Sequence, residues 1–218
     1  MISRRRMMMV GGPVAKTNGV INGVIQDSLK QVIINCQAGK ASEFYSVGDH
    51  VLIPLSGLGE FYFDYLGSNL DVRSDGQNKP VSSWLCRSVV AMCSWNTTLT
   101  TAGGWQFSNI RNYCRESIFN RLPNYLETEI VQVDKVANGA TTSDTVWIPS
   151  YEEMQPTGLY GERFPDIVSR KKDTAIAPWY WLRSLFSYEK GRLILASGRD
   201  DTLTVTDNSV GVVPGFCI

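Results

Sequence analysis

The sequence predicts an α+β fold of short antiparallel strands with two or three helices, preceded by an N-terminal extension. Residues 178–218 alternate apolar and polar side chains in short runs separated by Gly, Asp and Asn, which is typical of hairpin strands. Apolar side chains recur at helical spacing near the N-terminus and again after Ser108. The length of 218 residues and the hydrophobic content of 43% fit one domain with an extension.

Residues 1–19 are interpreted as a docking peptide rather than an export signal. Their basic region is followed by four apolar residues and then Gly11, which is too short for the apolar stretch of a signal peptide. Arginine suits carboxylates of a partner protein, and methionine fills irregular grooves. The residues expected to dock are Arg4, Arg5, Arg6, Met7, Met8 and Met9. A solvated tail is the alternative interpretation.

Residues 20–44 are predicted to form a helical linker to the main domain, which spans residues 45–218. Apolar side chains at positions 21, 25, 29, 32, 33 and 36 have the spacing of one helical face, and Gly39 is a suitable end. We expect this face to pack on the core of the domain. A helix that joins copies of the chain is the alternative.

The body of the main domain alternates strand patterns with polar segments. Strand patterns occur at 45–54, 60–67, 83–93 and 131–135. A helix is predicted to begin after its N-cap Ser108 and to end at the break marked by Pro123.

Two polar segments of this body are expected to be solvated. The loop at 68–80 carries Asp71, Asp75 and Asn78, a spacing weakly permissive for calcium, but without the terminal Glu of a full calcium loop. The run from Arg170 to Lys172 is interpreted as an exposed charged face.

An aromatic cluster opens the C-terminal stretch and is expected to anchor its sheet. Trp179, Tyr180 and Trp181 are adjacent, and each such side chain can bury on the order of 150–250 Å². The apolar runs at 193–195 and 203–205 follow, so the prediction here is a pair of hairpins.

Four motifs in order carry a resemblance to a known family. They are Gly104-Trp105-x-x-Ser108-x-x-Arg111, Leu122-Pro123, Asp144-x-Val146-Trp147-Ile148-Pro149-Ser150-x-Glu152-Glu153, and Trp181-Leu182-Arg183-Ser184 with a terminal Gly-Val-x-Pro. Together they resemble a bacterial and phage domain family of unknown function with a C-type-lectin-like core, related to the fold of formylglycine-generating enzymes and of phage receptor-binding proteins. The resemblance covers about residues 45–218. Val213 stands where the family usually has Arg.

The resemblance implies a bacteriophage virion protein, located in the virion after synthesis in the host cytoplasm. It would be a head or tail fibre or decoration that displays a C-type-lectin-like domain and binds a host-surface glycan or protein. Its expected partners are other virion proteins, bound through the N-terminus, and copies of itself in a trimer. In phage proteins of similar fold the ligand contacts lie in the C-terminal hairpins. The ligand-binding residues expected on that basis are Tyr188, Lys190, Arg199, Asp201 and Asn208.

Charge and hydropathy indicate neither a nucleic-acid partner nor a membrane partner. Lys+Arg and Asp+Glu both number 21, so the formal net charge is zero. No apolar run approaches the roughly 20 residues of a membrane-spanning helix.

Motifs for catalysis are missing, so no enzyme activity, cofactor or metal is predicted. No phosphate-binding glycine loop occurs, and His50 is the single histidine, for which a structural role in a strand is preferred. The five cysteines are expected to be free, mostly buried thiols, with a Cys114–Cys217 disulfide as an alternative. The competing function is a cysteine-dependent enzyme of the formylglycine-generating class, although Cys86 and Cys93 do not match its cysteine pair.

Overall fold

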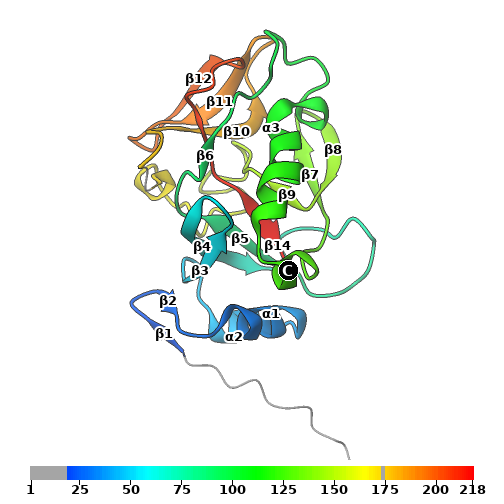
Figure 1. Cartoon of the computed structure of the whole chain (residues 1–218), viewed down its shortest axis with the longest axis vertical. Coiled ribbons are helices and arrows are strands. Elements are labelled where there is room, and N and C mark those ends of the chain that lie inside the picture. Colours follow the sequence, from blue (N-terminus) through cyan, green and yellow to red (C-terminus); the bar gives the residue numbers. More distant parts are fainter. Residues whose placement is uncertain (1–18, 173–174) are drawn as a thin grey trace, which may run out of the picture.

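Most of the regular structure is β-sheet. The computed structural model describes residues 19–172 and 175–218, and they form several sheets with few, short helices. Figure 1 shows the hairpin strands between residues 180 and 204 at the opposite end of the molecule from the first helices.

The largest sheet has seven strands and forms the centre of the molecule. In spatial order its strands are β1 (Val20–Ile21), β2 (Val24–Ile25), β3 (His50–Leu55), β4 (Gly59–Ser68), β5 (Ser82–Cys86), β14 (Gly215–Cys217) and β9 (Val146–Trp147). Neighbouring strands are antiparallel except β2 and β3, which pair in parallel. The C-terminal strand β14 lies between β5 and the edge strand β9, so residues far apart in the sequence are neighbours in this sheet.

A second sheet of five strands carries the C-terminal hairpins, and a third sheet has two strands. The five strands, in spatial order, are β12 (Asp200–Thr204), β11 (Lys190–Ile194), β10 (Tyr180–Leu185), β13 (Gly211–Val212) and β6 (Ala91–Met92). The small sheet pairs β7 (Val133–Ala137) with β8 (Ala140–Asp144). The hairpin prediction for the C-terminal stretch is therefore confirmed by antiparallel pairing of β10 with β11 and of β11 with β12.

The helices are short and lie outside the sheets. They are α1 (Leu29–Gln37), α2 (Ala41–Phe44), η1 (Trp105–Phe107), α3 (Asn109–Asn112), the π-helical η2 (Tyr113–Ile118), η3 (Phe119–Arg121), α4 (Asn124–Glu127) and η4 (Val168–Arg170). Ser108 caps α3 as predicted, because its Oγ accepts a hydrogen bond from the Arg111 amide.

The prediction of an α+β, C-type-lectin-like fold is wrong: the structure is mostly β, without a substantial helical part. The helix predicted between Ser108 and Pro123 does form, as consecutive α, π and 3₁₀ turns over residues 109–121. The N-terminal helix explains part of the difference. The helix predicted from residue 20 begins only at Leu29.

A tight turn explains why the first predicted helix is shorter than its apolar pattern. Asn22 and Gly23 both have positive φ, 53° and 78°, which is the conformation of a two-residue hairpin turn. Residues 20–25 therefore pair as β1 and β2, and Ser28 caps the helix that follows by accepting a hydrogen bond from the Gln31 amide. The spacing of apolar residues could not distinguish a helix from a hairpin over residues 20–25, because Ile21 and Ile25 fit either pattern.

The aromatic cluster of the C-terminal stretch lies in the core, as predicted. Tyr180 and Trp181 are fully buried, and Trp179 is partly buried against the same core. The Trp181 indole N–H donates to the Cys93 carbonyl, 2.9 Å away, which links β10 to the segment after β6. Within the described residues, no helix has the length and apolar character needed to cross a membrane.

The charged run near residue 170 is only partly solvated: Lys171 is exposed as predicted, whereas Lys172 is half-buried. Arg170 is buried, and its carbonyl accepts a hydrogen bond from the Tyr180 hydroxyl. Lys172 donates from Nζ to the Cys86 carbonyl at 2.8 Å. Burial lowers the pKa of Lys172 to about 8, although Asp64 partly opposes this shift.

We expect Lys172→Met to remove a pH-dependent contribution to stability. Between about pH 8 and the ordinary lysine pKa of 10.5, the unfolded chain keeps a proton that the folded protein has released. Stability contributed by Lys172 therefore rises with pH across this window. Denaturant unfolding would be measured at about pH 7 and about pH 10. The free energy of unfolding of the variant, relative to that of the wild type, should be lower at the higher pH. A difference that stays constant would contradict the buried environment of Lys172.

Candidate binding site

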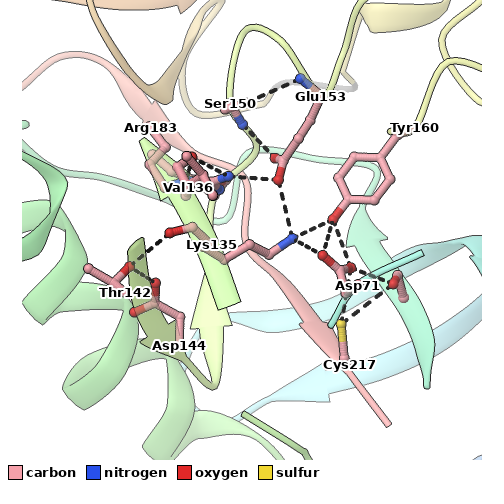
Figure 2. Close-up of polar contacts among 12 residues, drawn as sticks. Asp71, Lys135, Val136, Thr142, Asp144, Ser150, Glu153, Tyr160, Arg183 and Cys217 are labelled. Atoms are coloured by element: carbon pink, nitrogen blue, oxygen red, sulfur yellow. Dashed lines mark hydrogen bonds and ion pairs between the residues drawn. The ribbon is translucent and has the colours of Figure 1, made fainter. Parts of the chain in front are cut away.

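A charge-balanced network of buried side chains lies beneath the candidate site (Figure 2). Lys135 on β7 places Nζ 2.5 Å from Asp71 Oδ1 and 3.4 Å from Glu153 Oε1. Arg183 on β10 places Nη2 2.7 Å from the same Glu153 oxygen. Two cations thus meet two carboxylates, and the network joins β7, β10, the loop after β4 and the turn after β9.

The position of Lys135 follows from the alternation of β7. Val133, Lys135 and Ala137 occupy the buried face of this strand. The ammonium group of Lys135 therefore needs hydrogen-bond partners within the protein interior. Its ammonium lies 3.5 Å from the centroid of the Trp147 ring, and Nζ donates to the Tyr160 hydroxyl at 2.5 Å. Its three protons therefore have partners in Asp71, Glu153 and Tyr160 although the residue is buried.

The network fixes the protonation states of its members. Burial opposes ionisation of Asp71, but Lys135 and hydrogen bonds from Ser83 and Tyr160 outweigh it, and the pKa of Asp71 lies below its ordinary value. Burial also opposes ionisation of Glu153, yet Arg183 and Lys135 lower its pKa. Burial raises the pKa of Tyr160 well above its ordinary value, so its hydroxyl stays a hydrogen-bond donor.

A second buried network explains one motif of the sequence. Arg111 Nε lies 2.6 Å from Asp144 Oδ1, and the other oxygen accepts from Trp105 Nε1 at 2.9 Å and from Thr142 Oγ1 at 2.6 Å. The motif that begins at Gly104 therefore fastens η1 and α3 to β8, which is a structural role.

A groove opens to the surface above the first network, and we call it the Glu152 groove. It consists of two adjoining hollows of about 490 and 530 Å³ that share Glu152, Glu153 and Leu159. The first hollow also has Val72 and Val136 in its wall; both are more than half exposed, at 66% and 59%. The groove therefore combines exposed apolar side chains with carboxylates.

Two carboxylates that line this groove, Glu152 and Asp134, are exposed, and Ser184 holds Glu152 in place. The Ser184 hydroxyl donates to Glu152 Oε2 at 2.7 Å and accepts from the Tyr151 amide at 2.9 Å. Partial burial opposes ionisation of Glu152, but the hydrogen bond from Ser184 helps to lower its pKa. Glu152 therefore presents a fixed negative charge in the groove.

Arg192 on β11 borders the second hollow, next to aromatic rings. Its guanidinium lies 4.4 Å from the Tyr151 ring centroid and 5.4 Å from that of Phe186. It also pairs with Asp200 at 3.3 Å. Phe186, on the β10–β11 turn, is exposed, so an accessible aromatic ring lies next to Arg192.

The five residues predicted to bind a ligand are all exposed, but the structure separates them into two groups. Tyr188, Lys190 and Asn208 lie at one end of the hairpins, where the Val205 amide donates to the Glu189 carbonyl. Arg199 and Asp201 lie at the other end of β11 and β12.

Strand alternation separates the two groups further. Lys190 is two residues from Arg192 on β11 and shares its face. Asp201 pairs with Leu193 and lies on the opposite face. Of the two residues, Lys190 is therefore the one directed to the side of the groove.

The residues predicted for virion docking, Arg4–Arg6 and Met7–Met9, lie outside the described residues. That prediction remains one from the sequence.

Glu152, Ser184, Phe186 and Arg192 were not predicted from the sequence as a group. Glu152 and Ser184 do belong to two of the recognised motifs, which was the available signal. Their contact joins residues 32 apart in the sequence, so it required the pairing of β10 with the turn after β9.

A larger hollow near the C-terminus is a weaker candidate. It measures about 640 Å³, but three of its charged side chains already have partners. Arg73 pairs with Asp75 at 2.6 Å, and Gln37 donates to Glu129. The calcium alternative also fails at this loop, because Asp71 points into the core, and no group of metal-binding side chains is found within the described residues.

All five cysteines are free, as predicted, and four of them are buried. Burial raises the pKa of Cys36 and Cys93 to about 11 and that of Cys86 to about 12. Burial also raises the pKa values of Cys114 and Cys217 well above the ordinary value for cysteine. Because the thiolate is the nucleophile, these thiols are poorly suited to attack a substrate.

Fold and site together define a β-rich domain with a surface groove above a buried ion network. Residues 63–218, well over half of the chain, match the family described as domain of unknown function (DUF6273), and the chain belongs to that family. No curated protein matches the chain, and no solved structure matches it.

Proposed function

We propose that this chain is a bacteriophage virion protein that binds the surface of the host cell through the Glu152 groove. The observation that carries the binding role is the composition of this groove. Apolar side chains, a fixed carboxylate and an arginine flanked by aromatic rings lie together on strands and turns held by buried ion pairs. Aromatic and arginine side chains on a rigid support are typical of recognition surfaces.

The chemistry of the interior favours binding over catalysis. The buried carboxylates and cations satisfy one another, and the pKa values of the cysteines are raised. The virion location rests on the sequence alone: the Arg- and Met-rich N-terminus suits a docking peptide. A host-surface glycan fits the groove, because hydroxyl groups can bind Glu152 while a sugar ring packs on Tyr151 or Phe186.

The test is competition with adsorption of the phage to its host strain. Purified chain should reduce adsorption, and the double variant Glu152→Gln, Arg192→Met should compete about tenfold less well. Arg199→Ala is the matched control, because it removes an exposed cation at the other end of the same hairpin. Equal competition by the double variant would exclude the groove. Absence of competition, together with particles that do not bind an antibody to this chain, would exclude the virion role.

A further inference from the structure

The pair formed by Lys135 and Asp71 has features that the other ion pairs of the described residues lack. Both side chains are 1% exposed, and Nζ lies 2.5 Å from Asp71 Oδ1. The remaining ion pairs of the described residues, apart from the contact of Lys135 with Glu153, all use arginine. A lysine amine can become a nucleophile when it loses its proton, whereas arginine remains charged.

A second carboxylate and two hydroxyl groups surround this pair (Figure 2). Glu153 Oε1 lies 3.4 Å from Nζ and can accept its proton. Tyr160 donates to Asp71 Oδ2 at 2.9 Å, and Ser83 donates to the same oxygen at 2.6 Å. A base therefore faces the amine while hydrogen-bond donors face the carboxylate.

We propose that Lys135 and Asp71 become joined by an amide bond between their side chains, formed within the folded protein. The inference rests on the buried network alone and is independent of what the Glu152 groove binds. It assigns a covalent modification to the chain and a proton-transfer role to Glu153.

The reaction is a condensation that balances without a cofactor or an oxidant. Lys135 passes one proton directly to Asp71 Oδ1, 2.5 Å away, which leaves a free amine facing a neutral carboxylic acid. Nζ attacks the carboxyl carbon, and the hydroxyl groups of Tyr160 and Ser83 stabilise the negative charge that develops on Oδ2. Glu153 takes a second proton from Nζ and delivers it to Oδ1, which leaves as water when its bond to the carbon breaks.

Proximity and burial both favour the bond. Groups held at contact in a folded protein react as if present at effective concentrations of about 10⁵–10⁸ M. A buried ion pair carries a desolvation cost, and the amide removes both charges. Glu153 keeps its ion pair with Arg183 after the reaction, so no buried carboxylate loses its partner.

The bond would act as a covalent staple in a domain whose cysteines are all free. It would link β7 to the loop after β4, two positions 64 residues apart. Closing such a loop restricts the unfolded chain, as a disulfide does.

The test is the intact mass of the purified, folded full-length chain, measured after denaturation. The expected mass is lower than the sequence mass by one water, and a protease digest should contain a branched peptide that joins the Lys135 and Asp71 segments. Asp71→Asn provides a specific check, because its condensation releases ammonia and gives the same final mass as the wild-type product.

Two variants serve as controls. Glu153→Gln should fold and keep the full sequence mass, or lose water much more slowly, because the proton acceptor is missing. Lys135→Arg should keep its full sequence mass, because arginine cannot form the amide. This control distinguishes water lost through the Lys135–Asp71 amide from water lost at another aspartate. Folded wild-type protein at its full sequence mass would overturn the proposal, as would a water loss that persists in Lys135→Arg.

Discussion

Replacing Asp71 with alanine is expected to lower the free energy of unfolding by about 3–5 kcal/mol. The change leaves Lys135 buried without its nearest carboxylate, and it removes the acceptor for the hydroxyl protons of Tyr160 and Ser83. Glu153 cannot replace the lost partner fully, because Arg183 already occupies the same oxygen. Denaturant unfolding followed by tryptophan fluorescence would measure the loss.

A double variant separates the charge from the packing. Lys135→Met together with Asp71→Leu removes both charges and keeps apolar volume, and such exchanges are often neutral or stabilising. We expect it to recover the part of the Asp71→Ala loss that comes from the unpaired buried charge of Lys135, but no part that comes from the missing amide. Asp75→Ala is the surface control: Asp75 pairs with Arg73 on the surface, where ion pairs contribute little. An Asp71→Ala effect no larger than that of Asp75→Ala would contradict the structural role of the network.

The buried position of Asp71 could not be predicted from the sequence. Asp71 lies in a polar loop, and every local signal indicated a solvated residue. Its partner Lys135 is 64 residues away, on a strand whose alternation places a cation inside. Neither position is unusual by itself, so the pair became visible only when the loop and β7 were brought together.

The same limit applies to the charged run near residue 170. Runs of like charge usually face solvent, yet Arg170 and Lys172 are drawn inside by a carbonyl–hydroxyl contact with Tyr180 and by the Cys86 carbonyl. Local rules succeeded where the partner is close in sequence. The Ser108 cap and the hairpins between residues 180 and 204 depend on neighbours a few residues away and were predicted correctly.

Trp181→Ala is expected to cost about 3–5 kcal/mol of stability, the usual range for deleting a buried tryptophan. The ring is fully buried, and a carbon added at Gly191 would lie 3.1 Å from it, so β11 packs directly on the indole. The substitution also leaves the Cys93 carbonyl without the indole N–H.

The adjacent Trp179 is the matched comparison, because it has the same side chain but only partial burial. Trp179→Ala should cost clearly less than Trp181→Ala in the same denaturant titration. If the two variants lost equal stability, the sheet of β10, β11 and β12 would not be anchored at Trp181. Because Phe186 and Arg192 belong to the turn and strand that this anchor holds, Trp181→Ala should also weaken competition with phage adsorption, whereas Trp179→Ala should weaken it less.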